Sequence, residues 1–174
     1  LVFTNTWTNY LSNSVPVAVI TNPAPTAWLT SPSFNVAGVA SNNFGQLTGV
    51  WFSTNGISWA LTAGNSNWVT NHPLDDQATN VFYVKASNEF GFISSLVVQT
   101  NPVDTTPPVC AVTNPAAADM IISGIYLFAG SNLDPFSGVS QTLLAISNYS
   151  GPVYQGMATL GGNGWTCSWN TAMT

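Results

Sequence analysis

Short stretches in which apolar and polar residues alternate follow one another through most of the chain, and no segment shows the 3.6-residue apolar period of a helix. Residues 80–87 are an example, because Phe82, Val84 and Ala86 fall on one face while Lys85 falls on the other. Such alternation predicts β-strands with one face toward a core. Six further strands are predicted at 17–21, 33–41, 47–54, 57–63, 67–74 and 92–100. Asn55-Gly56 predicts a two-residue hairpin turn between two of them.

The chain contains the same unit twice. The segment PVAVITNPA, beginning at Pro16, returns as PVCAVTNPA beginning at Pro108, an offset of 92 residues. Farther on, GNSNW at 64–68 corresponds to GGNGW at 161–165, an offset of 97 residues, so the second copy carries a short insertion. About seven short strands between regularly spaced turn signals are typical of an immunoglobulin-like fold. We therefore predict an all-β protein of two tandem immunoglobulin-like β-sandwiches, domain 1 over 16–104 and domain 2 over 105–174.

Two segments carry a resemblance to a known family. DTTPPVCAVTNPA at 104–116 resembles the linker and first strand of the tandem Ig-like repeats of large bacterial secreted and cell-surface proteins, and residues 64–91 resemble the later strands of the same repeats. The sequence departs from that pattern at Asp75-Asp76, where the family often has Pro-Gly, and at Asn88, where an Asp is common. The resemblance covers about residues 16–174. It implies the fold strongly and function weakly, since such repeats serve mostly as spacers, stalks and adhesins.

The second copy ends before its last two strands. Its final residue corresponds to about residue 77 of the first copy, so the strand segments 80–87 and 92–100 have no counterpart. Residues 1–15 resemble the last strand of a preceding or neighbouring unit. Three explanations stay open: a window of a longer repeat protein, disordered final strands, or a subunit whose residues 1–15 complete a neighbour by donor-strand pairing. The last would give a head-to-tail homopolymer.

The composition excludes several classes of partner. Charged residues make up 4% of the chain, against about 25% in ordinary domains. One Lys, no Arg and a net charge of −5 leave almost nothing to bind nucleic acid or anionic membrane surfaces. The apolar runs are also too short for membrane insertion, which needs about 20 residues. An uncharged surface with almost no site for trypsin-like proteases favours a secreted or cell-surface location.

Catalytic chemistry has little support in the sequence. His72 is the only imidazole, and a triad would need Ser, His and Asp to converge on it. Asp75 and Asp76 are adjacent on a turn, so their side chains diverge. We expect no enzyme activity and no cofactor.

Five residues are weaker candidates for metal binding or cross-linking. Asp104, Asp119 and Asp134 are calcium candidates, although no D-x-D-x-D loop surrounds them. Cys110 and Cys167 are both predicted to face the core of domain 2, and either a disulfide or two buried thiols would fit.

The aromatic residues give the alternative function. Seven Trp and nine Phe exceed the needs of small sandwiches, although filling the core and the domain junctions would also account for them. Trp51 neighbours Phe52 on a strand, so one of the two must face outward, and Trp59 is a second candidate for a surface ring. The main expectation is a non-catalytic extracellular structural protein, an Ig-like repeat unit of a stalk, adhesin or filament. The alternative is a carbohydrate-binding or adhesive module that stacks polysaccharide on Trp51 and Trp59.

Overall fold

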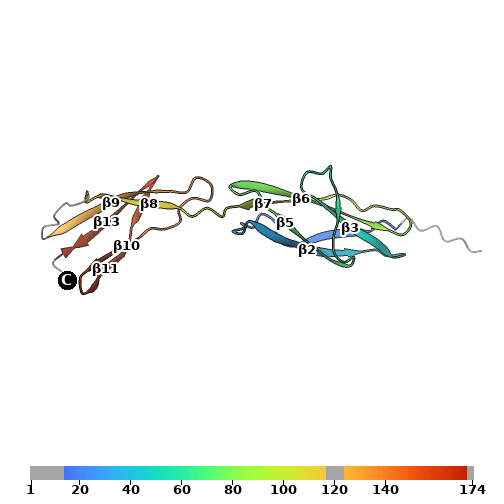
Figure 1. Ribbon diagram of the computed structural model, residues 1–174, viewed down its shortest axis with the longest axis horizontal. Coiled ribbons are helices and arrows are strands. Elements are labelled where there is room, and N and C mark those ends of the chain that lie inside the picture. Colours follow the sequence, from blue (N-terminus) through green and yellow to red (C-terminus); the bar gives the residue numbers. More distant parts are fainter. Residues whose placement is uncertain (1–13, 117–123, 172–174) are drawn as a thin grey trace, which may run out of the picture. The chain divides into compact units, whose positions relative to one another are not determined.

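The computed structural model describes residues 14–116 and 124–171. It divides the chain into two compact units, unit 1 (Leu1–Thr105) and unit 2 (Thr106–Thr174) (Figure 1). All the elements in the described ranges are β-strands, which confirms the all-β prediction. These ranges contain no helix that could cross a membrane. The strand predicted at 1–15 lies outside the described residues, apart from Ser14 and Val15.

Unit 1 is a sandwich of one three-stranded and one four-stranded antiparallel sheet. The strand orders are β1-β2-β5 and β4-β3-β6-β7. The chain therefore crosses between the sheets after β2, after β4 and after β5, which is the order of an immunoglobulin-like sandwich and confirms the predicted fold class. The strands are β1 (Val17–Asn22), β2 (Ser33–Ser41), β3 (Leu47–Ser53), β4 (Ala60–Leu61), β5 (Asn67–Pro73), β6 (Ala78–Asn88) and β7 (Val97–Val103).

Alternate residues of the two sheets form the core of unit 1. On β6, Phe82, Val84 and Ala86 are fully buried, as the alternation predicts. On β2, Val36 is fully buried, and Phe34 packs against the same cluster. Burying a large apolar side chain contributes about 1.5–3 kcal/mol. Strand β6 therefore supplies a large part of the stability of this unit.

The connection between β3 and β4 differs from the predicted two-residue turn. Phe52 pairs with Ala60, so residues 54–59 form a longer loop. Ser53 Oγ accepts a hydrogen bond from the N–H of Gly56 at 2.9 Å, and Asn55 Oδ1 accepts one from the N–H of Ile57 at 2.8 Å. These side-chain acceptors satisfy loop N–H groups that a tight hairpin would pair across the strands.

Strand β7 begins later than the predicted segment 92–100. Ser94 forms an irregular link before it, because its N–H donates to Ala86 O and its Oγ accepts from Ala86 N, both at 2.9 Å. The regular ladder with β6 then runs from Val97 to Val103.

Unit 2 repeats the plan of unit 1 with fewer strands. Its larger sheet has the order β12-β13-β9-β8, and its smaller sheet contains β10 and β11. By the repeat offset, β8, β9 and β13 correspond to β1, β2 and β5, and β10 corresponds to β3. The strands are β8 (Val109–Asn114), β9 (Ile125–Leu133), β10 (Leu143–Asn148), β11 (Gly151–Met157), β12 (Thr159–Gly161) and β13 (Gly164–Asn170).

A glycine beside a buried tryptophan occurs at the same place in both units. A Cβ atom on Gly38 would lie 2.4 Å from the Trp68 ring and 1.9 Å from a backbone oxygen. A Cβ atom on Gly130 would lie 2.4 Å from the Trp165 ring and 2.1 Å from a backbone oxygen. Only glycine leaves room for the indole at either position, so the two copies share this packing as well as their strand order.

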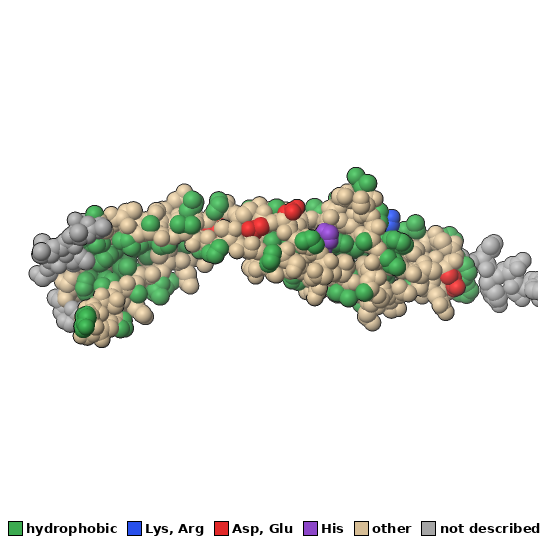
Figure 2. Space-filling model, viewed as in Figure 1, with side chains coloured by type: hydrophobic (Ala, Val, Ile, Leu, Met, Phe, Trp, Pro, Cys, Tyr) green, Lys and Arg blue, Asp and Glu red, His purple; other side chains and the backbone are tan. Residues whose placement is uncertain are grey.

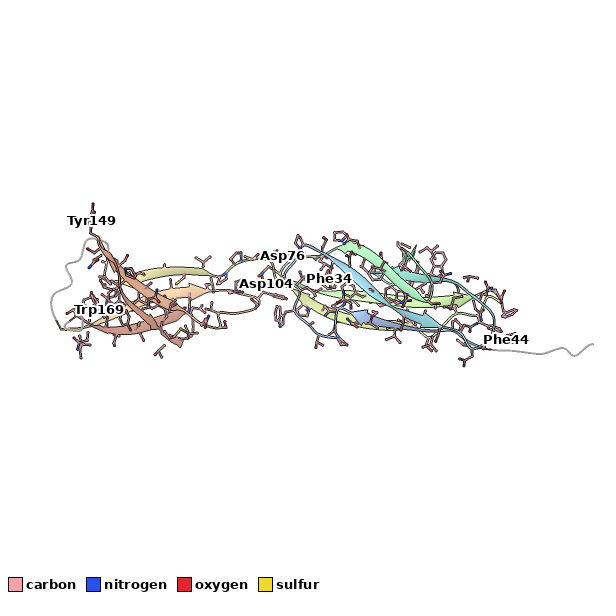
Figure 3. All side chains as sticks on the ribbon, turned by 90° about the horizontal axis from the view of Figure 1, so that it is seen from below. Phe34, Phe44, Asp76, Asp104, Tyr149 and Trp169 are labelled. Atoms are coloured by element: carbon pink, nitrogen blue, oxygen red, sulfur yellow. The ribbon has the colours of Figure 1, made fainter. Side chains whose placement is uncertain are left out.

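The core of unit 2 is small and aromatic. Phe128, Leu144, Trp165 and Cys167 are its buried residues. Trp169 packs at its margin, with ring centroids 6.3 Å from Phe128 and 6.1 Å from Tyr154 (Figure 3).

Unit 2 differs from unit 1 at the place of β6 and β7. In unit 1, β3 pairs with β6, and β6 pairs in turn with β7. Among the described residues of unit 2, β10 pairs with β11 alone. The other edge of β10 therefore has no partner strand in this part of the chain, and open edges of this kind are templates for pairing with further strands.

The exposure of β8 follows from the same difference. In unit 1, β1 contacts β6 and β7, and Ala18 and Ile20 are 5% and 7% exposed. Their equivalents Cys110 and Val112 are exposed, Val112 by 54%. Hydrophobic side chains accordingly gather in a visible patch on unit 2 (Figure 2).

The prediction that Cys110 is a core residue is therefore wrong. Cys110 pairs with the buried Asn132, so its side chain does lie on the inner face of the sheet. It is exposed because nothing in the described part of unit 2 corresponds to the strands that cover Ala18.

Candidate ligand-binding site

Trp51 lies on the outer face of the four-stranded sheet of unit 1. Its neighbour Phe52 is buried in the core, so the alternation of β3 turns Trp51 outward, where it is half-buried. The ladder places Trp51 opposite Leu61 on one side and Lys85 on the other. Residues directly opposite in a ladder have side chains on the same face, so Trp51 and Lys85 are neighbours.

Trp59 reaches the same face from the loop 54–59. The ammonium group of Lys85 lies 3.9 Å from the centroid of the Trp59 ring. This is a cation–π contact, worth about 0.5–1 kcal/mol at an exposed site. The loop conformation set by Ser53 and Asn55 therefore places the Trp59 ring, the second ring predicted to stack on a sugar, against Lys85.

The two tryptophans border one surface hollow. Its volume is about 460 Å³, within the ~300–1,000 Å³ range of small-molecule sites. Its lining combines two indole rings, one cation and several hydroxyl and amide groups: Thr48, Trp51, Trp59, Lys85, Ser87, Asn88, Gly91 and Ile93.

Polar side chains on one side of the hollow are held by hydrogen bonds. Thr48 Oγ1 and Ser87 Oγ lie 2.9 Å apart, and Trp51 Nε1 donates to Ser87 Oγ at 3.4 Å. Asn88 is 2% exposed, and its Oδ1 accepts hydrogen bonds from the N–H groups of Phe90 and Phe92 at 3.1 and 3.0 Å. The rim next to β6 is thus ordered by side-chain contacts.

The hollow presents groups that can bind a ligand. Its lining contains aromatic faces, hydroxyl groups and one ammonium group, with no carboxylate, imidazole or thiol. The sequence identified both tryptophans but missed Lys85, Thr48 and Ser87. The outward position of Lys85 was predicted from the alternation, but its place beside Trp51 depends on the pairing register of two strands that are distant in sequence.

The two cysteines are free thiols in the structure. Cys110 on β8 and Cys167 on β13 flank β9, the strand between them. Two strand spacings separate their Cα atoms by at least ~9 Å, beyond the ~7 Å limit for a disulfide. Of the two alternatives left open by the sequence, the disulfide is excluded, while Cys167 is the buried thiol that was expected.

Cys167 is in contact with a tyrosine. Tyr154 Oη lies 3.4 Å from Cys167 Sγ and donates to Ser168 O at 3.2 Å. The hydrogen bond with Cys167 raises the pKa of Tyr154, with a smaller effect of burial in the same direction.

The calcium candidates are engaged with hydrogen-bond donors or lie outside the described residues. Asp134 Oδ1 accepts from the N–H of Ser137 at 3.0 Å, and Oδ2 accepts from Ser137 Oγ at 3.0 Å. Burial alone would raise the pKa of the Asp134 carboxyl, but the hydrogen bonds from Ser137, Phe136 and Gly138 outweigh it and hold the pKa below its usual value. Asp104 accepts from Gln77 Nε2 near Asp76 (Figure 3). Asp119 lies outside the described residues.

Within the described ranges, no group of three or more His, Cys, Asp or Glu side chains could hold a metal ion. The Asp134 carboxylate accepts N–H groups of its own turn, whereas the Asp104 carboxylate accepts the side-chain amide of Gln77, which is distant in sequence. The His72 ring packs on Phe52, with ring centroids 5.5 Å apart.

Comparison with known proteins gives no family assignment. No family model and no curated protein matches the chain. Among solved structures, the fibronectin(III)-like modules of Clostridium thermocellum CbhA match with 13% identity and a TM-score of 0.47, covering 89% of this chain and 79% of that one. An engineered protein matches with 18% identity and a TM-score of 0.38 over 51% of this chain, which spans 20% of that protein. Membership of the tandem bacterial Ig-like repeats stays a prediction.

Proposed function

We propose that this chain is a non-catalytic structural protein of the cell exterior, an Ig-like repeat unit of a stalk, adhesin or filament. The observation that carries the proposal is the open side of unit 2. There, β10 presents an edge without a partner strand in the described residues, and β8 exposes the inner-face residues Cys110 and Val112. A unit of this kind gains stability when another segment supplies the strands that β6 and β7 supply in unit 1.

The incoming segment would act by donor-strand pairing. Its backbone would pair with the edge of β10, and its alternate apolar side chains would cover β8 and the aromatic core. Two sources fit: further sequence of the same polypeptide, or residues 1–15 of a neighbouring copy. The second source makes a heterologous contact that does not close on itself, so copies add head to tail into a filament.

The composition supports an extracellular location. With 4% charged residues, one Lys and no Arg, the chain offers trypsin-like proteases almost no cleavage site. A surface of neutral amides and hydroxyls also has little charge repulsion to oppose association.

Sedimentation velocity over a range of concentrations tests the filament form of the proposal. The full chain is expected to form oligomers that grow with concentration, and a chain lacking residues 1–13 is expected to stay monomeric with the same circular dichroism spectrum. Equal association of both chains, or none in either, would exclude residues 1–15 as the donor.

A second candidate function is carbohydrate binding at the hollow of unit 1. The observation that favours it is that Trp51 from β3 and Trp59 from the loop 54–59 line one hollow of about 460 Å³, together with the hydroxyl groups of Thr48 and Ser87. Co-sedimentation with insoluble polysaccharides tests it. Retention should be lost in Trp51→Ala and kept in Trp28→Ala, a control at another half-exposed tryptophan. Absence of retention on every polysaccharide would reject this candidate.

A further inference from the structure

Lys85 lines the hollow and has no carboxylate partner within residues 14–116 and 124–171. Lys85 is the only Lys or Arg among 174 residues. Its ammonium group contacts the face of Trp59 at 3.9 Å, and it forms no ion pair with an acidic side chain of the described residues. The sequence contains six acidic residues, so the fold could have placed a carboxylate beside the Lys85 ammonium group.

The acidic side chain nearest in sequence is directed elsewhere. Glu89 follows Asn88 at the end of β6, but its Oε1 accepts the N–H of Gln46 at 2.8 Å, and Glu89 does not line the hollow. At physiological ionic strength the Debye length is about 8 Å, so the low overall charge of −5 acts weakly on a ligand held at Lys85.

The remaining lining groups match the other surfaces of a sugar ring. Indole faces accept the apolar C–H face of a pyranose, and the hydroxyl groups of Thr48 and Ser87, 2.9 Å apart, can donate to and accept from ring hydroxyls. An ammonium group has three donors and no acceptor, so it selects an anionic oxygen over a neutral hydroxyl.

We propose that the hollow of Trp51, Trp59 and Lys85 binds acidic saccharides, with the pyranose on the indole surface that Lys85 leaves open and a uronic carboxylate on the Lys85 ammonium group. This inference rests on the carbohydrate-binding candidate function and narrows its ligand class. Neutral polysaccharides bind the same rings more weakly, because they offer no group that replaces the hydration of the ammonium ion.

The test compares two polymers with the same sugar backbone, polygalacturonate and its methyl ester, in which the carboxylate charge is removed. Each is titrated into the intact protein while tryptophan fluorescence or calorimetry is recorded. Polygalacturonate should bind at least about tenfold more tightly, as expected for a charge-assisted hydrogen bond. Lys85→Gln should bind the two polymers with similar affinity, and Lys85→Arg should retain the preference for polygalacturonate.

Two controls keep the result interpretable. Thermal unfolding of each variant should match the parent protein, and Trp28→Ala should bind like the parent. Binding of both polymers with equal affinity, unaffected by Lys85→Gln, would overturn the acidic preference and leave carbohydrate binding standing. Binding of neither polymer, in a sample that also retains no neutral polysaccharide, would overturn both.

Discussion

At the scale of single residues, the internal repeat allows equivalent positions to be compared within one molecule. Gly38 and Gly130 have the same role, because each lies against a buried indole and a backbone oxygen. Asn88 has no equivalent among the described residues of unit 2, where no strand corresponds to β6. Such positions indicate which contacts belong to the fold and which belong to unit 1.

Alanine at either glycine should destabilise its own unit. The added Cβ would lie 1.9 Å from Val19 O at position 38 and 2.1 Å from Ala111 O at position 130. Overpacking of this kind costs about 1–3 kcal/mol. Denaturant unfolding should show Gly38→Ala lowering the stability of unit 1 and Gly130→Ala that of unit 2. Gly91→Ala is unsuitable as a control, because the φ of +80° at Gly91 would strain any other residue. An unchanged unfolding midpoint in both Gly38→Ala and Gly130→Ala would contradict the shared packing.

Asn88→Asp should weaken unit 1 at neutral pH. Asn88 Nδ2 donates to Ser14 O at 2.9 Å, and a carboxylate cannot donate there. Losing this hydrogen bond and placing a carboxylate at a position that is 2% exposed should together cost about 1–3 kcal/mol. Asn65→Asp is the matched control, because Asn65 Nδ2 also donates to a backbone oxygen, at 3.2 Å, but is exposed. Equal unfolding midpoints for Asn88→Asp and the parent protein would show that the Ser14 contact contributes nothing.

At the scale of elements, the difference between β1 and β8 is set by neighbouring strands and not by their own sequences. Both strands pair antiparallel with the next strand in the same register pattern, and both place alternate apolar residues on the inner face. In unit 1 these residues are covered by β6 and β7, whereas in the described part of unit 2 they are not.

The pair Ile20→Ala and Val112→Ala should therefore give unequal effects. Ile20 is 7% exposed, so its truncation removes buried contacts and should cost unit 1 about 2–4 kcal/mol. Val112 is 54% exposed, so its truncation should cost unit 2 less than about 1 kcal/mol. Chemical denaturation followed for each unit measures both values. A Val112→Ala effect as large as that of Ile20→Ala would mean that β8 is covered.

Strands were predictable where apolar and polar residues alternate strictly. They were less predictable where side chains form hydrogen bonds with backbone groups. Alternation placed Phe82, Val84 and Ala86 in the core correctly. It missed the loop 54–59, because Asn55-Gly56 signals a tight turn unless Ser53 and Asn55 bind the loop N–H groups. For the hollow, the sequence supplied the rings, but the position of Lys85 depends on the ladder between β3 and β6.

At the scale of the whole molecule, the two units are unequally complete versions of one fold. The buried core of unit 1 draws on six of its strands, all except β4, whereas unit 2 has no described counterpart of β6 and β7. Unit 2 should consequently depend on an added strand for part of its stability, and its exposed inner face is the place where that strand would act.

Alkylation of Cys110 is the most direct test of an open second sandwich. With iodoacetamide and mass spectrometry, exposed Cys110 should react at least about tenfold faster than buried Cys167. A peptide with the sequence of residues 77–104, which spans β6 and β7, should slow Cys110 to the rate of Cys167, whereas a scrambled peptide should have no effect. If Cys110 is already protected without the peptide, or if its rate does not change with the peptide, unit 2 is not the strand acceptor proposed above.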